Sequence, residues 1–359
     1  MGLIVNLVLL PGCVSNRTPG AAPASPPVLL PVLDRFTAAD VPAMGAAETE
    51  APPGRWINGF TPPNLPGHGL AEHPMLYVGE GYNKIFVVRD GKVIWTYSTG
   101  KSSEYDDVWM LSNGNILFSR MGYVAEVTPE KKVVWRYDCH NEPDADHTEV
   151  HCCQPIGLNK VLFIVNGTPP KLMVVNTQTG AVEVDHPLPF NKPSKPGNVH
   201  GQFRRVRMTA AGTYLVPFLS MGQVVEYDQN FNQVWSYKIN TPWAAIRLKN
   251  GDTLITDEKD HLSREVNARG ETVWEFNDSE LPAAYRLAAA PQTCTRLANG
   301  NTIFCSRGNS RGAGPQLVEI TPDKHVVWVL QDWKTLGPAT AVQILDEPGV
   351  PENPGDSQH

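Results

Sequence analysis

The sequence predicts an all-β fold, a six-bladed β-propeller that is closed by a C-terminal strand and preceded by a disordered N-terminal tether. The first observation is a tryptophan-containing segment, rich in β-branched and aromatic residues, that recurs after short polar turns and predicts a strand each time. Trp95 and Trp135 are 40 residues apart, and Trp235 and Trp274 are 39 residues apart. A four-stranded unit that repeats every ~40–50 residues is typical of a propeller blade. The copies are Lys92–Tyr97, Lys132–Tyr137, Gln233–Tyr237, Glu271–Phe276 and His325–Leu330, with a degenerate copy at Gly180–Val184.

The second observation is an Asn-Gly hairpin that precedes three of the tryptophan strands. Asn113-Gly114, Asn250-Gly251 and Asn299-Gly300 each lie between alternating apolar residues. This pattern predicts a two-residue type I′ turn, which needs a positive φ at both residues. Each unit is therefore expected to run from an inner strand through the hairpin to a second strand, a third strand and the tryptophan strand, with the tryptophan largely buried.

The third observation concerns the two ends of the repeats. The segment before the complete units, Leu76–Tyr97, supplies three strands, and the segment after them, Thr340–Leu345, supplies one. Joining these segments completes a sixth blade and leaves no open sheet edge. The five complete units begin near Glu104, Glu149, Gln202, Thr241 and Gln292.

Composition and charge indicate which partners the protein is expected to have. The net charge is −7 and basic residues do not cluster, so we expect no nucleic-acid partner. No apolar run reaches the ~20 residues that span a bilayer. We expect a monomer. The predicted domains are a signal-like segment at 1–13, an Ala- and Pro-rich tether at 14–55, a lead-in at 56–72, the propeller at 73–345 and a C-terminal tail at 346–359.

The N-terminal segment carries a targeting motif. Leu10-Pro11-Gly12-Cys13 follows a mostly apolar run and resembles the signal of bacterial lipoproteins, in which the cysteine carries the lipid. No Lys or Arg precedes the run, which departs from that signal. The resemblance implies lipidation at Cys13, export to the cell envelope or periplasm, and contact with the membrane only through the lipid anchor.

The repeats also resemble a known group of propellers. Asn-Gly-Asn-x-Leu hairpins followed by Val-Val-Trp-x-Tyr strands, over about residues 73–345, are similar to those of the six-bladed bacterial arylsulfotransferase-like propellers and of exported PQQ-like repeat proteins. Arylsulfotransferases use a channel histidine to carry the sulfuryl group and cationic neighbours to neutralise it. The resemblance therefore implies catalytic roles for His147, His151, His200 and Arg204, although no motif of that family aligns residue by residue.

Alignment of the inner strands on their turns predicts a polar ring at one mouth of the channel. Side chains two residues apart share a face of a strand, so two levels of residues are expected to face the channel together. The residues of this ring include both charge signs, an imidazole and an indole. They predict a site for a small polar or carbohydrate ligand. The residues expected to bind the ligand are Glu104, Asp106, Glu149, Gln202, Trp243 and Gln292. The first level is Asp106, His151, Arg204, Trp243, Gln292 and Thr340, and the second is Glu104, Glu149, Gln202, Thr241, Ala290 and Pro338.

The same region contains residue types that bind cofactors in other proteins. His147, Glu149 and His151 alternate, so they share one face of an extended strand and could bind a divalent metal, but a solvated acidic loop explains them as well, and we assign no metal ligand. The adjacent pair Cys152-Cys153 resembles the disulfide between neighbouring cysteines that some PQQ dehydrogenases carry beside the cofactor. Those enzymes have eight blades and a calcium site, so PQQ is disfavoured and the cofactor stays unknown.

The sequence leaves three function classes open. The protein is a ligand-binding propeller of the cell envelope, an enzyme that acts on a sulfate ester or a uronic-acid sugar at the same mouth, or a scaffold. Convergence of the channel histidines and arginine on one small volume would favour an enzyme, and dispersal around a wide mouth would favour a binding protein. A separate pair, Cys294 and Cys305, is predicted to lie directly opposite across the Asn299-Gly300 turn.

Overall fold

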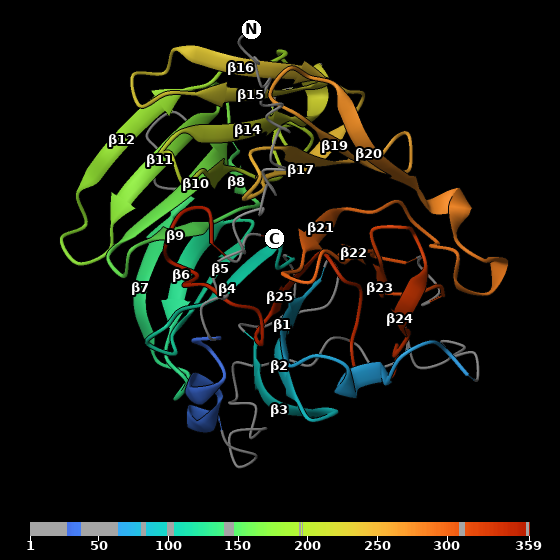
Figure 1. Ribbon diagram of the computed structural model, residues 1–359. Coiled ribbons are helices and arrows are strands. Elements are labelled where there is room, and N and C mark those ends of the chain that lie inside the picture. Colours follow the sequence, from blue (N-terminus) through green and yellow to red (C-terminus); the bar gives the residue numbers. More distant parts are fainter. Residues whose placement is uncertain are drawn as a thin grey trace, which may run out of the picture.

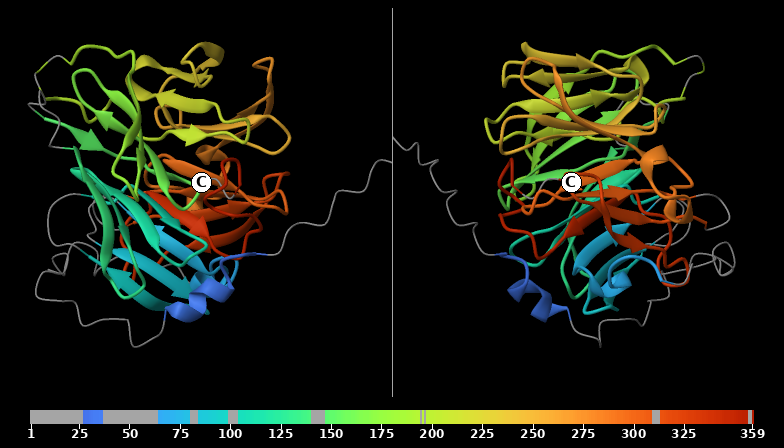
Figure 2. Two further views of the ribbon diagram at one scale, coloured as in Figure 1. Left: turned by 90° about the vertical axis from the view of Figure 1, so that its left-hand side faces the viewer. Right: turned by 45° about the vertical axis from the view of Figure 1, so that its right-hand side comes forward.

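The computed structural model describes residues 27–36, 64–79, 84–98, 104–139, 147–193, 195, 197–308, 313–356 and 359. In this part of the chain, six antiparallel sheets surround a central axis, and the predicted six-bladed all-β propeller is confirmed (Figures 1 and 2). Helical structure among these residues is limited to short 3₁₀ segments at Pro31–Arg35, Gly69–Ala71, Leu219–Met221, Asp278–Glu280 and Ala283–Tyr285.

Each blade runs outward from an innermost strand near the axis (Figure 1). The innermost strands are β25 (Ala341–Ile344), β4 (Asp107–Met110), β8 (Glu149–Val150) with β9 (Gln154–Ile156), β13 (Arg207–Met208), β17 (Pro242–Arg247) and β21 (Thr293–Arg296). The second strands are β1 (Met75–Val78), β5 (Ile116–Arg120), β10 (Lys160–Asn166), β14 (Tyr214–Phe218), β18 (Thr253–Asp257) and β22 (Thr302–Cys305). The third strands are β2 (Ile85–Arg89), β6 (Tyr123–Val127), β11 (Lys171–Asn176), β15 (Gln223–Tyr227), β19 (Leu262–Val266) and β23 (Leu317–Ile320). The outer strands are β3 (Lys92–Tyr97), β7 (Val133–Asp138), β12 (Val182–Pro187), β16 (Gln233–Lys238), β20 (Thr272–Asn277) and β24 (Val326–Leu330).

The ring closes as the sequence predicts. β25 pairs antiparallel with β1, with Met75 opposite Ile344 and Val78 opposite Ala341, and completes the sheet of β1, β2 and β3. Buried apolar side chains of neighbouring sheets pack against each other between the blades, for example Leu76 of β1 and Phe118 of β5 in one cluster. The core is therefore a ring of interblade layers.

The Asn-Gly hairpins are three-residue loops, so the predicted type I′ turns are wrong. In the loop between β4 and β5, the Leu111 amide donates to the Asn115 carbonyl at 2.8 Å. Gly114 has a φ of +86°, whereas Asn113 is absent from the residues with positive φ. The Asn113 Oδ1 instead accepts from the Asn115 amide at 2.9 Å. A type I turn followed by one left-handed glycine is the geometry of a three-residue hairpin.

The same loop geometry shifts the cysteines by one residue. Cys294 lies opposite Phe304, and Cys305 lies opposite Thr293, so the predicted direct opposition of the two cysteines is wrong. Cys152, Cys153, Cys294 and Cys305 are all buried free thiols. Burial raises the pKa of Cys152 and of Cys294 to about 12, which keeps both thiols protonated.

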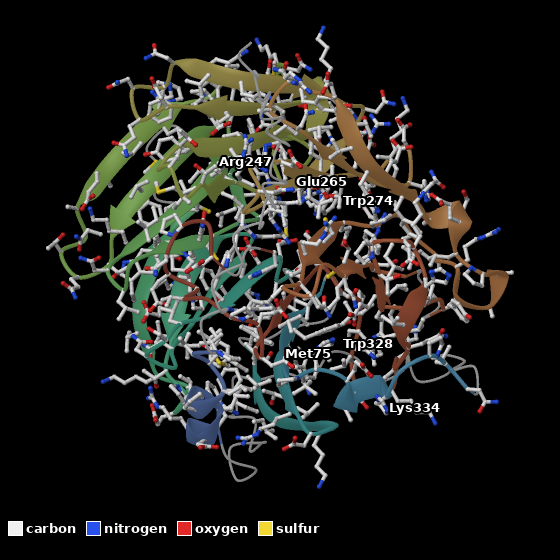
Figure 3. All side chains as sticks on the ribbon, in the orientation of Figure 1. Met75, Arg247, Glu265, Trp274, Trp328 and Lys334 are labelled. Carbon is white, nitrogen blue, oxygen red and sulfur yellow. The ribbon has the colours of Figure 1, made fainter. Side chains whose placement is uncertain are left out.

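The tryptophan strands take part in a repeated interblade contact (Figure 3). Glu265 of β19 lies opposite Trp274 of β20, and its carboxylate bonds to Arg296 of the next blade at 2.8 Å. The Arg296 guanidinium lies 5.3 Å from the centre of the Trp274 ring. Trp95 and Trp328 are buried, and the other three strand tryptophans are half-buried. The same arrangement recurs in Glu226, Arg247 and Trp235, and in Glu319, His73 and Trp328.

His73 occupies the place of an arginine in this contact, which makes the contact sensitive to pH. Burial alone would lower the pKa of His73, but hydrogen bonds and charges of Asp346 and Glu319 outweigh burial and raise it to about 9. Because the folded-state pKa lies above the ordinary value of 6.5, the stabilisation is complete below pH 6.5 and is lost as the pH rises through 9.

We expect the free energy of urea unfolding to fall by about 1–2 kcal/mol between pH 6.5 and about 9, after allowance for solvent screening. The His73→Arg variant restores the residue type of the other copies and should not show this fall, because arginine stays charged. Equal pH profiles for the wild type and His73→Arg would contradict the assignment.

Residues at both ends of the propeller pack against it. Leu29, Leu33 and Phe36 are buried, and the Phe36 ring contacts Trp95 edge to face at 5.5 Å. Residues 27–36 therefore depart from the predicted tether, because three apolar side chains at helical spacing can bury a face. The signal-like segment, Cys13 and the other tether residues lie outside the described part of the chain. The predicted tail also packs, since Gly157 donates to the carbonyl of Glu352 at 2.8 Å.

Candidate functional site at one mouth of the channel

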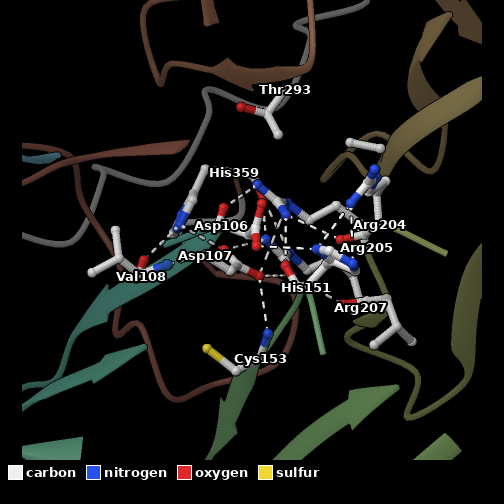
Figure 4. A network of polar contacts seen from close by, with 12 residues as sticks. Asp106, Asp107, Val108, His151, Cys153, Arg204, Arg205, Arg207, Thr293 and His359 are labelled. Carbon is white, nitrogen blue, oxygen red and sulfur yellow. Dashed lines mark hydrogen bonds and ion pairs between the residues drawn. The ribbon is translucent and has the colours of Figure 1, made fainter. Parts of the chain in front are cut away.

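Four residues of the predicted ring form a continuous chain of contacts across four blades, and Figure 4 shows Asp106, His151 and Arg204 of this chain. Asp106 Oδ2 lies 3.0 Å from His151 Nδ1, and Arg204 Nη1 lies 2.9 Å from the same nitrogen. The Arg204 guanidinium also lies over the Trp243 ring, 4.7 Å from its centre. Asp106 comes directly before β4, His151 directly after β8, Arg204 before β13, and Trp243 inside β17. The fold thus brings residues that are distant in sequence into one cluster.

The position of His151 depends on an interruption of its inner strand. Three residues separate β8 from β9, and the first and third of them, His151 and Cys153, bond to the neighbouring blade. The Cys153 amide donates to Asp107 Oδ2 at 3.1 Å, and the Trp109 indole donates to the Cys153 carbonyl at 2.6 Å. This detour places the His151 ring against Asp106 of the adjacent blade.

Glu149 gathers three imidazoles around one carboxylate. Its Oε2 lies 2.9 Å from His151 Nε2 and 2.7 Å from His200 Nδ1, and its Oε1 lies 2.8 Å from His147 Nε2. Burial favours the neutral carboxyl, but the hydrogen bonds from these three histidines outweigh burial and lower the pKa of Glu149. Glu149 is therefore ionised at neutral pH and fixes the orientation of all three rings.

Exposure falls steadily from the mouth inward. The side chains of His147 and His200 are 44% and 46% exposed, and that of Glu104 is 18% exposed. Asp106 and His151 are almost completely buried. The cluster is therefore reached from the end at which the innermost strands begin, with the two exposed histidines at the entrance.

Arg205 closes the inner side of this cluster, a role that the sequence analysis missed. Its guanidinium donates to the carbonyl oxygens of Asp106 at 2.6 Å, His151 at 3.0 Å and Thr340 at 3.4 Å (Figure 4). These carbonyls belong to three different blades, so a fully buried cation lies between their inner strands and ties them together. The available signal was a second arginine directly beside Arg204, a residue of the predicted ring.

A buried ion pair follows next to Arg205. Arg207 bonds to both oxygens of Asp107, at 2.8 and 3.1 Å, and donates to the carbonyl of His359. The His359 ring packs on Trp109 and its Nε2 lies 2.9 Å from the Val108 carbonyl. Burial is the main cause that lowers the pKa of His359 to about 4, so its imidazole is neutral. These groups fill the channel with protein on the inner side of the candidate site.

The other predicted residues lie beside the cluster. Gln202 uses both ends of its amide on the backbone of Gly167, at 3.1 and 2.9 Å, and so holds the chain at that point. Gln292 is buried directly before β21, and its carbonyl accepts from the Thr256 hydroxyl at 2.8 Å. Glu104 Oε1 lies 3.9 Å from a nitrogen of both His151 and His200.

Some buried polar atoms of the cluster make no hydrogen bond. These are Asp106 Oδ1, Arg204 Nε and the indole nitrogen of Trp243. A buried polar atom without a partner costs about 1–3 kcal/mol. One acceptor and two donors in this cluster therefore mark a place where a bound molecule or ion can supply the missing interactions.

Solved structures of other proteins are similar to this chain. No family model and no curated protein matches the chain. The solved structure of a protein of unknown function from Bacteroides caccae has a TM-score of 0.64 and 25% identity over 75% of this chain and 97% of that chain. The chain is a β-propeller. A catalytically inactive histidine-to-alanine variant of virginiamycin B lyase from Staphylococcus aureus, solved with quinupristin, has a TM-score of 0.51 and 14% identity over 77% of this chain and 91% of that chain.

A second lyase structure, described as a streptogramin B lyase, gives the same TM-score of 0.51 with 13% identity, over 76% of this chain and 85% of that chain. At this identity the lyases share the fold alone. No family model supports the resemblance to arylsulfotransferase-like or PQQ-like proteins, which stays a prediction. Among the described residues, no helix is long and apolar enough to cross a bilayer.

Proposed function

We propose that this propeller binds a small polar ligand with an anionic group, such as a uronic-acid sugar, at the channel mouth. The observation that carries the proposal is the contact of Arg204 with Trp243, in which a guanidinium nitrogen and the indole nitrogen are both buried without a hydrogen-bond partner. Guanidinium donors suit carboxylate oxygens, and an indole offers both a donor and an apolar face.

The surroundings limit the size and the orientation of the ligand. Arg205 lies between the inner strands on one side, and His147 and His200 are exposed on the other. A ligand therefore enters past the two histidines with its anionic group toward Arg204. The lipoprotein-like segment ending at Cys13 supports a location in the cell envelope, where sugar acids are encountered outside the cell.

Titration calorimetry with D-galacturonate tests the proposal, with D-galactose as the neutral control. We expect the acid to bind and the Arg204→Gln variant to lose at least about tenfold in affinity, because a hydrogen bond to a charged group contributes about 1.5–3 kcal/mol. The matched control is Arg269→Gln, which removes an exposed arginine on an outer loop. The proposal would be contradicted if the wild type and Arg204→Gln bound galacturonate equally, or if the wild type bound both sugars equally.

Acid–base catalysis at the same mouth is a second candidate function. It is favoured by the convergence of three imidazoles on Glu149, which is the feature that distinguishes an enzyme from a binding protein. A propeller lyase that loses activity when one histidine is replaced shows that this fold can use histidine in catalysis. His200 is the half-exposed base on this view, and product analysis in the same titrations decides: turnover that His200→Ala abolishes supports an enzyme.

A further inference from the structure

We infer that the channel mouth is a binding site for a divalent first-row transition-metal ion, held by Glu104, Asp106, His151 and His200. The inference rests on side-chain geometry and is independent of the sugar proposed above. Among the described residues, Glu104, His151 and His200 present ligand atoms that all lie within 4.8 Å of one another.

The spacing of these atoms fits an ion between them. Glu104 Oε1 lies 3.9 Å from His151 Nδ1 and 3.9 Å from His200 Nε2. Metal–nitrogen and metal–oxygen distances near 2.0–2.2 Å place two ligand atoms of a tetrahedral site about 3.4 Å apart. A shift of about half an ångström would therefore bring Glu104 Oε1 to this spacing from each nitrogen, and the two histidine nitrogens already lie within 4.8 Å of each other.

Glu149 already orients both imidazoles for metal binding. Its Oε2 bonds to His151 Nε2 at 2.9 Å and to His200 Nδ1 at 2.7 Å. A carboxylate accepts both hydrogen bonds, so in the metal-bound state these two nitrogens carry the protons, and His151 Nδ1 and His200 Nε2 are the nitrogens that bind the ion. Those are the two nitrogens that face Glu104. A carboxylate that holds the outer nitrogen of a ligand histidine is the usual support of a protein metal site.

Asp106 supplies a fourth ligand and a reason for a cation. Its Oδ2 lies 3.0 Å from His151 Nδ1, a contact that an ion between the two atoms would replace, and its buried Oδ1 makes no hydrogen bond. At this level the carboxylates of Glu104, Asp106 and Glu149 surround the His151 ring, and the Arg204 guanidinium contacts that ring instead of the carboxylates among the described contacts. A bound cation would satisfy the Asp106 oxygen and balance this negative charge.

Arg204 would lose part of its contact with His151 when the ion binds. Its Nη1 lies 2.9 and 3.1 Å from the two nitrogens of His151, so the guanidinium lies against the ring. Metal binding at Nδ1 takes the lone pair that this contact uses. The stacking on Trp243 does not depend on that lone pair, and it keeps Arg204 beside the ion as a binding group for an anionic ligand.

The types of ligand atoms at the site indicate which metal ions it would bind. Two imidazoles with two carboxylates suit Zn²⁺, Mn²⁺, Fe²⁺ or Co²⁺, whereas Mg²⁺ and Ca²⁺ prefer oxygen ligands throughout. A second group of similar residues, Glu72, His73 and Glu319, also brings its ligand atoms together. Its histidine takes the place of the interblade arginines Arg247 and Arg296, so that group is explained by the fold and serves as the control.

The test uses the full chain after treatment with EDTA. We expect calorimetry to show one equivalent of Mn²⁺ or Zn²⁺ bound and no competition from an equal concentration of Mg²⁺. Co²⁺ should give visible absorption bands of a nitrogen-ligated ion. Glu104→Gln and His200→Gln should each weaken binding at least tenfold, and Glu149→Gln should weaken it ~10–100-fold because it releases the ligand histidines. His73→Arg and His261→Gln, which alter histidine–carboxylate contacts elsewhere, should bind as the wild type does.

Thermal unfolding separates loss of the site from loss of the fold. A ligand that binds the native state raises the melting temperature, so Mn²⁺ should raise it for the wild type and the controls and not for Glu104→Gln or His200→Gln. Absence of binding by the EDTA-treated wild type overturns the inference, as does unchanged binding in both ligand variants or loss of binding in His73→Arg. Because no sugar is present, these results do not depend on whether galacturonate binds.

Discussion

A chain that ends at Pro338 is expected to lose the cooperative fold of the entire propeller. The truncation removes β25, which pairs with β1 and covers its inner edge. Burial of a Val, Leu or Ile side chain contributes about 1.5–3 kcal/mol, so the loss of buried Val342, Ile344 and Leu345 costs about 5–9 kcal/mol. This is comparable with the ~5–15 kcal/mol that stabilises a typical domain.

The loss also reaches the next blade, because β25 connects two blades. The Gln343 side chain accepts from the Met110 amide at 2.6 Å and donates to the Met110 carbonyl at 3.3 Å. The carbonyl of Thr340, which accepts from Arg205 and from the Thr293 hydroxyl, disappears as well. We therefore expect circular dichroism to show no cooperative thermal transition, and dyes that bind exposed apolar surface to bind the truncated chain.

A chain that ends at Asp346 is the matched control. It keeps β25 and Leu345, and loses the contacts of Glu352 and His359 with the blades. It should melt cooperatively at a lower temperature than the wild type. A chain ending at Pro338 that melts cooperatively at the temperature of this control would show that ring closure contributes little to stability.

The blade pattern could be predicted because it repeats in chemically distinctive residues. Tryptophans at intervals near 40 residues and Asn-Gly turns fix the number and order of the strands, and the pairing of Thr340–Leu345 with the first segment followed from the count. The turn type could not be predicted in the same way. Asn-Gly suits both a two-residue and a three-residue hairpin, and the choice decides whether Cys294 faces Cys305 or Phe304.

The candidate site was predictable only where the inner strands are in register. Counting from the turns brought Asp106, His151, Arg204 and Trp243 to one level, and the structure joins them in one chain of contacts. Arg205 was missed because alternation places it on the opposite face, whereas the segment before β13 is irregular and turns both arginines inward. In such a segment the period of two no longer decides which side chains share a face.

The position of His359 had no sequence signal at all. The residues of the predicted tail show neither the alternation of a strand nor the apolar spacing of a helix, yet His359 packs on Trp109 and contacts Arg207 inside the channel. Its burial depends on the space that the six blades leave around the axis. That space is a property of the closed ring and is not encoded in any local pattern.

Replacing Asp107 by alanine is expected to destabilise the propeller by about 3–5 kcal/mol, because it leaves buried cations without their counter-charge. Asp107 is completely buried and forms two hydrogen bonds with Arg207, and its Oδ2 lies 3.9 Å from Arg205 Nε. Burial favours its neutral form, but the charges of Arg205 and Arg207 outweigh burial and lower its pKa. Urea unfolding at neutral pH measures the change in the free energy of unfolding.

The exposed pair of Asp138 with Arg136 provides the control, since removal of a surface ion pair costs about 0–1 kcal/mol. Equal losses in Asp107→Ala and Asp138→Ala would contradict the assigned importance of burial. A double variant, Asp107→Asn with Arg207→Met, should lose less than the sum of its single variants, because removal of both charges leaves no unpaired ion between them. The stability that the double variant still lacks then reflects Arg205, which remains without a carboxylate beside it, together with the lost bonds of Arg207 to the His359 carbonyl.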